Sequence, residues 1–342
     1  MGRAANKLLI ALALGARCAG SSFCDDPSFT LEWGDEFDGE SLDLTKWSPV
    51  CTDISEDASC LPPFPTHSSS NGAECRSASC SASHVGVAAG NLVLTSARDQ
   101  DNASAWVTGA VKTATKAAWT TDDGAYRVCI SAKLPGGGAS AGAGQGIWPA
   151  HWMMPADDPC DPDEGEMDIF EMVDGSGAAE ATYHWQSGWP NETCAYPDGH
   201  EEIWGARDLG LGWAQRFHEF AVERSAGRIV FAVNGVVVAN SSAYEPPAVG
   251  GAFRRRGARD MVAPLGAQGI LEDSGAGGEA VPMAAATSAD PAPVDDIKLW
   301  PIPFYLILNS AVGGGWPGEP DERTLSPTFQ LVDYVRLVRA KK

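Results

Sequence analysis

Three acidic residues in the run GEMDIFEM are the strongest chemical signal in the sequence: Glu166, Asp168 and Glu171. They alternate with apolar residues, and charged side chains are seldom placed among apolar ones without a task. On a strand, residues two apart share a face, so Glu166 and Asp168 point the same way. Glu171 would point the other way unless one β-bulge restores its parity. Paired carboxylates on one sheet face suit cleavage of a glycosidic bond. The pattern alone also fits a rim strand that simply solvates one face.

Aromatic and polar residues near the triad could form sugar subsites. Trp148 and Trp152 are four apart in GIWPAHWMMP and share one strand face. TYHWQSGW supplies His184 and Trp185, and Asn309 and Trp316 follow the apolar run that begins at Pro303. Indole faces suit the apolar faces of pyranose rings, while polar groups bind the hydroxyls. Each aromatic residue could instead be part of the core.

The elements that position these residues are predicted to be strands. Short β-prone runs cover residues 91–95, 124–131, 217–223, 229–233, 304–308 and 331–338, with Gly, Pro, Asn or Asp between them. Their spacing indicates a β-sandwich or barrel. Asn234-Gly235 between two apolar runs predicts a two-residue hairpin turn.

The remaining sequence favours an extracellular protein. Residues 1–20 resemble a signal peptide, with a basic start and a short apolar run. The nine cysteines become eight without Cys18, which allows up to four disulfides of open connectivity. Sequons at Asn102, Asn191 and Asn240 predict glycosylated surface loops. We expect a secreted, extracellular or cell-wall location and no membrane span.

Residues 21–342 are predicted to form a single domain with two irregular stretches. Residues 51–87 form a Cys- and Ser-rich loop, and residues 246–296 form an insertion rich in Gly, Ala and Pro. The formal net charge of −21 argues against nucleic acid as a partner and is compatible with a neutral polysaccharide.

Taken in order, several motifs resemble glycoside hydrolase family 16, most of all its laminarinase-like endo-β-1,3-glucanases. They are WGDEFDG, GNLVLT, KLP, GIWPAHWMMP, GEMDIFEM, FHEFAVE, VNGVVV, PFYLILNSAVGGGWPG and VDYVRL. The sequence departs from the family at Ala110, where an arginine is usual, and at Arg127 and Cys129, where charged partners are usual.

The resemblance implies an all-β jelly-roll (concanavalin A-like) sandwich of two curved antiparallel sheets with a concave substrate cleft. It implies a retaining mechanism with Glu166 as nucleophile, Glu171 as general acid/base and Asp168 between them. The negative charges of Glu166 and Asp168 are expected to raise the pKa of Glu171.

The resemblance further implies a β-glucan substrate, β-1,3 or also β-1,3-1,4, and a protein that acts as a monomer. No cofactor is expected for the chemistry. A structural calcium ion is a further expectation, with Glu36, Gly90 and Asp333 in the matching region. Three alternatives remain open: a transglycosylase on wall glucan, a non-catalytic β-glucan-binding protein and a sulfated-galactan hydrolase.

Overall fold

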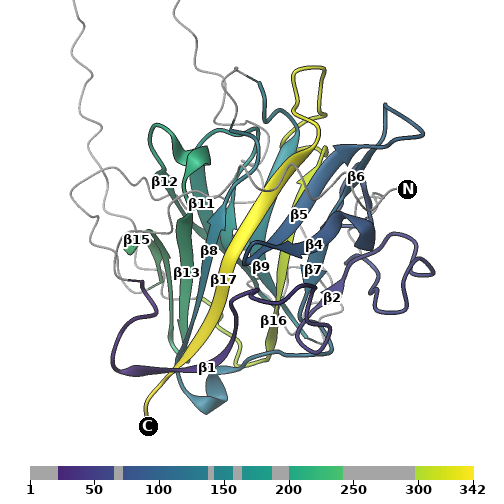
Figure 1. Ribbon diagram of the computed structural model, residues 1–342. Helices are drawn as coiled ribbons and strands as arrows, with labels where there is room; N and C mark the ends of the chain where they lie inside the picture. The colour runs from purple at the N-terminus through teal and green to yellow at the C-terminus, as the bar shows by residue number, and fades with distance from the viewer. Residues whose placement is uncertain (1–21, 65–71, 138–141, 157–163, 187–199, 242–296) are drawn as a thin grey trace, which may run out of the picture.

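The computed structural model describes residues 22–64, 72–137, 142–156, 164–186, 200–241 and 297–342. The predicted signal peptide, Asn191, Cys160, Cys194 and the 246–296 insertion lie outside these ranges. In the described residues the strands form two sheets that pack face to face, with β17 crossing the front of the molecule in Figure 1. No helix in the ranges given above is long and apolar enough to cross a membrane.

Within the described ranges, one sheet has ten strands in the order β15-β14-β13-β8-β17-β5-β6-β3, with β1 on β17 and β4 on β5. Their bounds are β1 Phe29–Asp35, β3 Ser79–Cys80, β4 Val85–Ala88, β5 Asn91–Arg98, β6 Trp106–Thr108, β8 Tyr126–Lys133, β13 His218–Ser225, β14 Arg228–Val233, β15 Val236–Asn240 and β17 Thr328–Ala340. Three short 3-10 helices lie at Ala82–His84 (η2), Thr121–Asp123 (η3) and Trp213–Gln215 (η4).

The second sheet has seven strands in the described residues, in the order β12-β11-β10-β9-β16-β7-β2. Their bounds are β2 Ser48–Pro49, β7 Ala110–Lys112, β9 Ile147–Pro155, β10 Glu166–Glu171, β11 Ala178–Gln186, β12 His200–Asp208 and β16 Phe304–Val312. The core lies between the two sheets and includes fully buried Phe170, Phe220, Phe231 and Phe304. We call the other surface of this sheet, which faces away from the core, its outer face.

The all-β sandwich predicted from the sequence is confirmed. Each of the six β-prone runs lies largely within a strand, because alternating apolar residues bury one face of each run against the core. Asn234 and Gly235 join β14 to β15 with φ angles of 49° and 70°, as a two-residue hairpin turn of this kind requires. One local exception to the predicted antiparallel pairing is the parallel pairing of β3 with β6.

The Cys/Ser-rich stretch is more structured than a plain loop. It contains β3, η2 and β4, and the disulfides Cys51–Cys60 and Cys75–Cys80 staple it. Among the sequons, Asn102 is exposed, but Asn240 is half-buried at the end of β15. The prediction of a surface loop is therefore wrong for Asn240, because this residue belongs to strand β15 and pairs with Val230 of β14.

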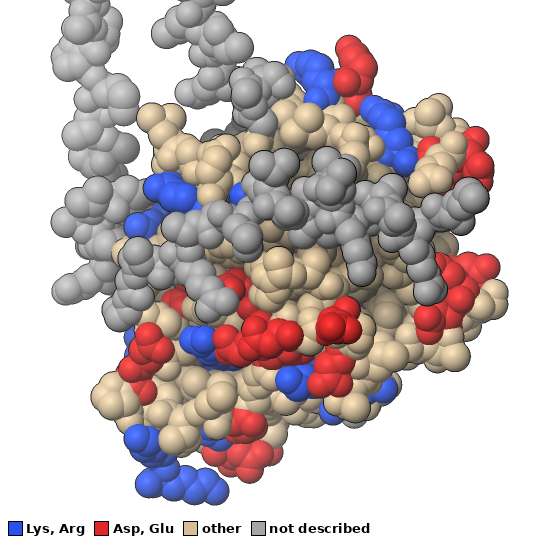
Figure 2. Space-filling model, viewed as in Figure 1, with Lys and Arg blue, Asp and Glu red and all other residues tan. Residues whose placement is uncertain are grey.

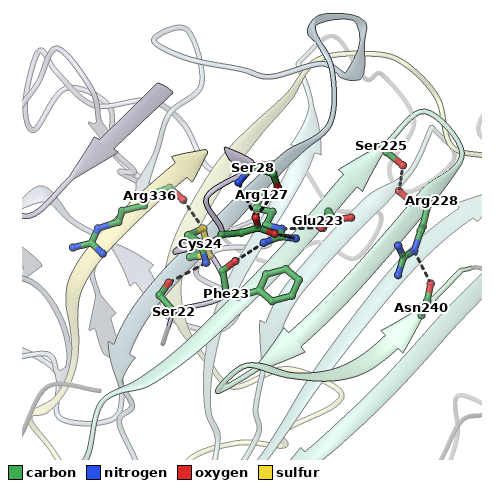
Figure 3. Close-up of polar contacts among 12 residues, drawn as sticks. Ser22, Phe23, Cys24, Ser28, Arg127, Glu223, Ser225, Arg228, Asn240 and Arg336 are labelled. Carbon is green, nitrogen blue, oxygen red and sulfur yellow. Dashed lines mark hydrogen bonds and ion pairs between the residues drawn. A yellow bond between two sulfur atoms is a disulfide. The ribbon is translucent and has the colours of Figure 1, made fainter. Parts of the chain in front are cut away.

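The N-terminal segment is fastened to the outer surface of the ten-stranded sheet (Figure 3). Cys24 forms a disulfide with Cys129 across 105 residues of sequence. Arg127 bonds Glu223 at 2.7 Å, and its guanidinium lies 4.3 Å from the ring centre of Phe23. Two of the three departures from the family pattern are thereby explained, since Arg127 and Cys129 hold this segment in place.

Acidic side chains gather in several groups on the face of the molecule shown in Figure 2, with basic side chains between them. Several of the exposed acidic residues are paired, such as Glu36 with Arg336 and Glu32 with Arg339. The side chains of Glu36 and Glu32 are exposed at 44% and 39%, and ion pairs with an exposed partner contribute little to stability.

Candidate active site

Strand β10 carries a bulge at the position that the sequence requires. Its pairing with β11 joins Glu166 to His184, Asp168 to Thr182 and Glu171 to Glu180, with a register shift between Asp168 and Glu171. The register between β11 and β12 has no shift, so His184, Thr182 and Glu180 share one face of β11. The three carboxylates therefore share the outer face of the seven-stranded sheet.

The two residues inside the bulge show how the parity is restored. Ile169 and Phe170 are adjacent, and both are fully buried in the core. In a regular strand one of the two would face outward. The extra inward residue turns Glu171 back to the side of Glu166 and Asp168.

Glu171 is the carboxyl group with the most distinctive surroundings. The indole N–H of Trp148 donates a hydrogen bond of 2.9 Å to its Oε1. Burial raises the pKa of Glu171 well above its ordinary value, and the charges of Asp168 and then Glu180 add to this rise. His184 and the Trp148 hydrogen bond act in the opposite direction. The upward direction agrees with the prediction from sequence. Burial is the main cause, and of the two charges named in that prediction, Asp168 contributes to the rise.

Asp168 lies between the two glutamates and is almost completely buried. Its Oδ2 is 3.0 Å from Nε2 of His184 on the neighbouring strand. His184 is thus placed beside the carboxylates, and its predicted contact with the sugar stays a prediction. On the far side of the row, the Trp204 N–H donates to Glu180 at 2.8 Å.

Two of the predicted tryptophans lie together next to Glu171. The rings of Trp148 and Trp316 meet edge to face at 5.0 Å, and Trp316 is 37% exposed. The Arg76 guanidinium lies 4.7 Å from the centre of the Trp148 ring. This group offers an aromatic surface with a cationic edge beside the proposed acid.

Trp152 and Asn309 share this outer face but are buried, at 5% and 2% exposure. The Trp152 N–H donates to Asn309 Oδ1 at 2.8 Å, and the Asn309 amide donates to the backbone carbonyl of Glu74 at 3.1 Å. Neither side chain offers surface for a sugar ring, so we now assign them to holding the 72–80 segment over β9 and β16.

Trp185 does not belong to the site. It is 2% exposed and stacks on Tyr183 in the core, with ring centres 5.6 Å apart. Adjacent residues of a strand face opposite sides, so His184 and Trp185 cannot both face the carboxylates. The prediction of Trp185 as a substrate-binding residue is therefore wrong.

A buried ion pair fixes the same segment at the other end of the sheet. Lys112 Nζ lies 3.2 Å from Glu74 Oε1, and both side chains are buried. Lys112 also donates to the Pro62 carbonyl at 2.7 Å. Ala110, the third departure from the family pattern, is fully buried and packs against the Cys75–Cys80 disulfide.

The structure gives no support to Glu36 as a side-chain ligand of calcium. Both of its carboxylate oxygens bond the Arg336 guanidinium, at 2.7 and 2.9 Å. Gly90 adopts a φ of 72°, and Asp333 is buried on β17. The calcium site stays a prediction.

Sequence reasoning missed three groups near the carboxylates: Arg76, Glu180, and the alternating His200, Glu202 and Trp204 of β12. In the run HEEIWGA, the residues of this last group are two apart, so on a strand they share one face. Arg76 is brought in by the 72–80 segment and had no local signal.

These features define an all-β sandwich protein whose carboxylate row suits glycosidic bond cleavage. Comparison with known proteins agrees. Residues 97–253 match the sequence profile of Glycosyl hydrolases family 16. This match covers a little less than half of the chain, and it agrees with the resemblance to glycoside hydrolase family 16 seen in the motifs.

Two relatives and one solved structure illustrate the similarity. The chain is 26% identical over 324 residues to "Glucan endo-1,3-beta-glucosidase A1" of Niallia circulans, covering 90% of this chain but only 38% of that protein. It is 25% identical over 347 residues to "Beta-glucanase" of Rhodothermus marinus, covering 97% of this chain and 93% of that protein. The catalytic domain of an endo-1,3-beta-glucanase (laminarinase) from Thermotoga petrophila superposes with a TM-score of 0.58 at 23% identity, covering 92% and 99% of the two chains. This last likeness supports the fold.

Proposed function

We propose that the protein is a secreted, retaining endo-β-glucanase that hydrolyses a neutral β-1,3-glucan such as laminarin, with or without β-1,4 linkages. The observation that carries the proposal is the bulged strand β10, which puts Glu166, Asp168 and Glu171 on one face. The names of the two relatives describe enzymes that act on glucans, and this is consistent with the proposal.

In the proposed mechanism, Glu166 attacks the anomeric carbon while Glu171 gives its proton to the departing glycosidic oxygen. Glu171 must begin protonated, and its raised pKa supports that role. The glycosyl–Glu166 ester then removes one negative charge from the site. Glu171 can then accept a proton from water, which attacks the same carbon from the leaving-group side and restores the original anomeric configuration.

The neighbouring side chains would orient the sugar and the acid. Trp148 holds the Glu171 carboxyl through its N–H, and the exposed Trp316 ring offers a stacking face next to it. His184 fixes Asp168 from the adjacent strand. The disulfides support a secreted location, because such bonds persist in oxidising compartments.

The test compares Glu166→Gln and Glu171→Ala with Glu32→Gln, a matched carboxylate change on the exposed strand β1. With laminarin as substrate, reducing-sugar release should nearly vanish in Glu166→Gln, while laminarin binding persists. The control should keep the wild-type rate. Full activity of Glu166→Gln would overturn the assignment of the nucleophile.

Azide distinguishes the retaining mechanism. Azide added to Glu171→Ala should attack the glycosyl-enzyme and give a β-glycosyl azide, detected by mass spectrometry and proton NMR. An α-glycosyl azide would contradict double displacement. Product sizing on laminarin, mixed-linkage glucan and agarose then identifies the substrate, and elongated chains would indicate transglycosylation instead of hydrolysis.

A further inference from the structure

A second group of polar side chains lies beside the carboxylates, on the same face but one strand further out. His184 of β11 is directly opposite Glu202 of β12, and His200 lies diagonally, opposite Gln186. Cross-strand neighbours of this kind bring their side chains into contact. The two imidazole rings stack with centres 5.1 Å apart.

Three ligand atoms of this group face one another. His184 Nδ1 is 3.2 Å from His200 Nε2 and 3.4 Å from Glu202 Oε2, and the remaining edge is 3.8 Å. Ligand atoms bonded to a tetrahedral zinc ion at about 2.0–2.2 Å are about 3.3–3.5 Å apart. The triangle needs only a contraction of its longest edge to fit such an ion.

We propose that His184, His200 and Glu202 form a binding site for a divalent transition-metal ion, with zinc as its typical occupant. Two imidazoles and one carboxylate are the protein ligands of known zinc sites that leave a further position open. The site is distinct from the predicted calcium region, and it shares His184 and its neighbour Asp168 with the candidate active site.

Asp168 gives this site the outer partner that metal-bound histidines generally have. Its Oδ2 is 3.0 Å from His184 Nε2, the ring nitrogen that faces away from His200. A proton on Nε2 that is donated to Asp168 leaves a lone pair on Nδ1, which a metal would bind in place of the contact with His200. Asp168 would thus select the tautomer of His184 that a metal requires.

The hydrogen bond between His184 Nδ1 and His200 Nε2, at 3.2 Å, accounts for one edge of the triangle, and the two edges to Glu202 are longer. The Glu202 oxygen is 3.4 and 3.8 Å from the two nitrogens, beyond the usual 2.7–3.2 Å of hydrogen bonds to nitrogen. The 3.4 Å distance suits two atoms that share an ion, and the 3.8 Å distance would have to shorten. His200 and Glu202 are buried at 6% exposure each, while the His184 side chain retains 18% exposure and offers a path for entry.

Metal binding can be measured directly on the full-length, untagged protein after treatment with a chelator. Zinc is titrated against a chromophoric competitor, and Co²⁺ is added separately to observe the visible absorption of a four-coordinate site. We expect one ion per chain. His200→Ala should weaken zinc binding by more than the about 10–100-fold that loss of an outer partner costs.

Two further variants sharpen the test. His84→Ala removes a histidine from η2, which packs beside the ten-stranded sheet, and should leave zinc affinity unchanged. Asp168→Asn should weaken binding about 10–100-fold, because an amide no longer enforces the Nε2 proton of His184. Glu202→Gln, which preserves side-chain size, serves as a second ligand variant if His200→Ala does not fold, as judged by circular dichroism.

The proposal is overturned if the wild type shows no saturable zinc binding. It is equally overturned if folded His200→Ala and Glu202→Gln bind zinc with wild-type affinity, or if His84→Ala lowers the affinity as much as they do.

Discussion

Replacing Trp148 with Phe isolates the hydrogen bond that the indole N–H donates to Glu171, since the aromatic ring that faces Trp316 is largely kept. This bond stabilises the ionised form of Glu171 and works against the burial that raises its pKa. Without the bond, the pKa of Glu171 should rise further. The proton of the general acid would then be retained to higher pH.

The magnitude follows from the type of bond. A hydrogen bond to a charged group contributes about 1.5–3 kcal/mol. Glu171 is half-buried, so we take the lower value, and a loss of about 1.5 kcal/mol corresponds to roughly a tenfold fall in rate. Negative charge develops only partly on Glu171 as it gives up its proton. A decrease of up to about tenfold in kcat/KM at the optimum pH is therefore expected.

The assay is the pH dependence of kcat/KM on laminarin, with Trp316→Phe as the matched control. That variant alters the same aromatic pair and leaves the Trp148 N–H in place. Trp148→Phe should move the basic limb of the profile to higher pH, and the control should not. A basic limb that stays in place, or that moves to lower pH, would refute this account of Glu171.

Two further predictions concern stability. Glu171→Gln should raise the thermal midpoint of unfolding at neutral pH. The folded-state pKa of Glu171 lies above the unfolded value near 4.5, so wild-type stability falls as pH rises from about 4.5 through the folded-state pKa. The gain in midpoint should therefore vanish at pH 4, and an equal gain at pH 4 would contradict this prediction. Lys112→Met leaves the Glu74 carboxylate buried without its ion-pair partner and should lower the free energy of unfolding in urea by about 3–5 kcal/mol. The double variant Lys112→Met/Glu74→Gln should recover much of this loss. An unchanged urea midpoint for Lys112→Met would show that the pair is not buried in solution.

Local sequence rules were sufficient to predict where the strands lie and that the three carboxylates share one face. Alternation with one bulge predicted that Glu166 and Glu171 share a face, and the pairing of β10 with β11 confirms this. The same alternation could have excluded Trp185, which is adjacent to His184 and therefore points into the core.

The burial of Trp152 and Asn309 could not be predicted in this way. It depends on the 72–80 segment, whose Glu74 carbonyl bonds Asn309 across 235 residues of sequence. Such contacts are set by the path of a long segment between strands, for which alternation gives no information. The connectivity of the disulfides that staple this segment was open for the same reason.

Asp168→Asn supplies a prediction of opposite sign to Trp148→Phe. The Asp168 charge raises the pKa of Glu171, so its removal should lower that pKa and move the basic limb of kcat/KM to lower pH. The measurement is made on laminarin in the presence of a chelator, so that metal bound at His184 does not contribute. If both variants moved the limb in the same direction, the charges and hydrogen bonds around Glu171 would not control its proton. Movement in opposite directions would assign the basic limb to Glu171, because these two neighbours act on that carboxyl with opposite sign.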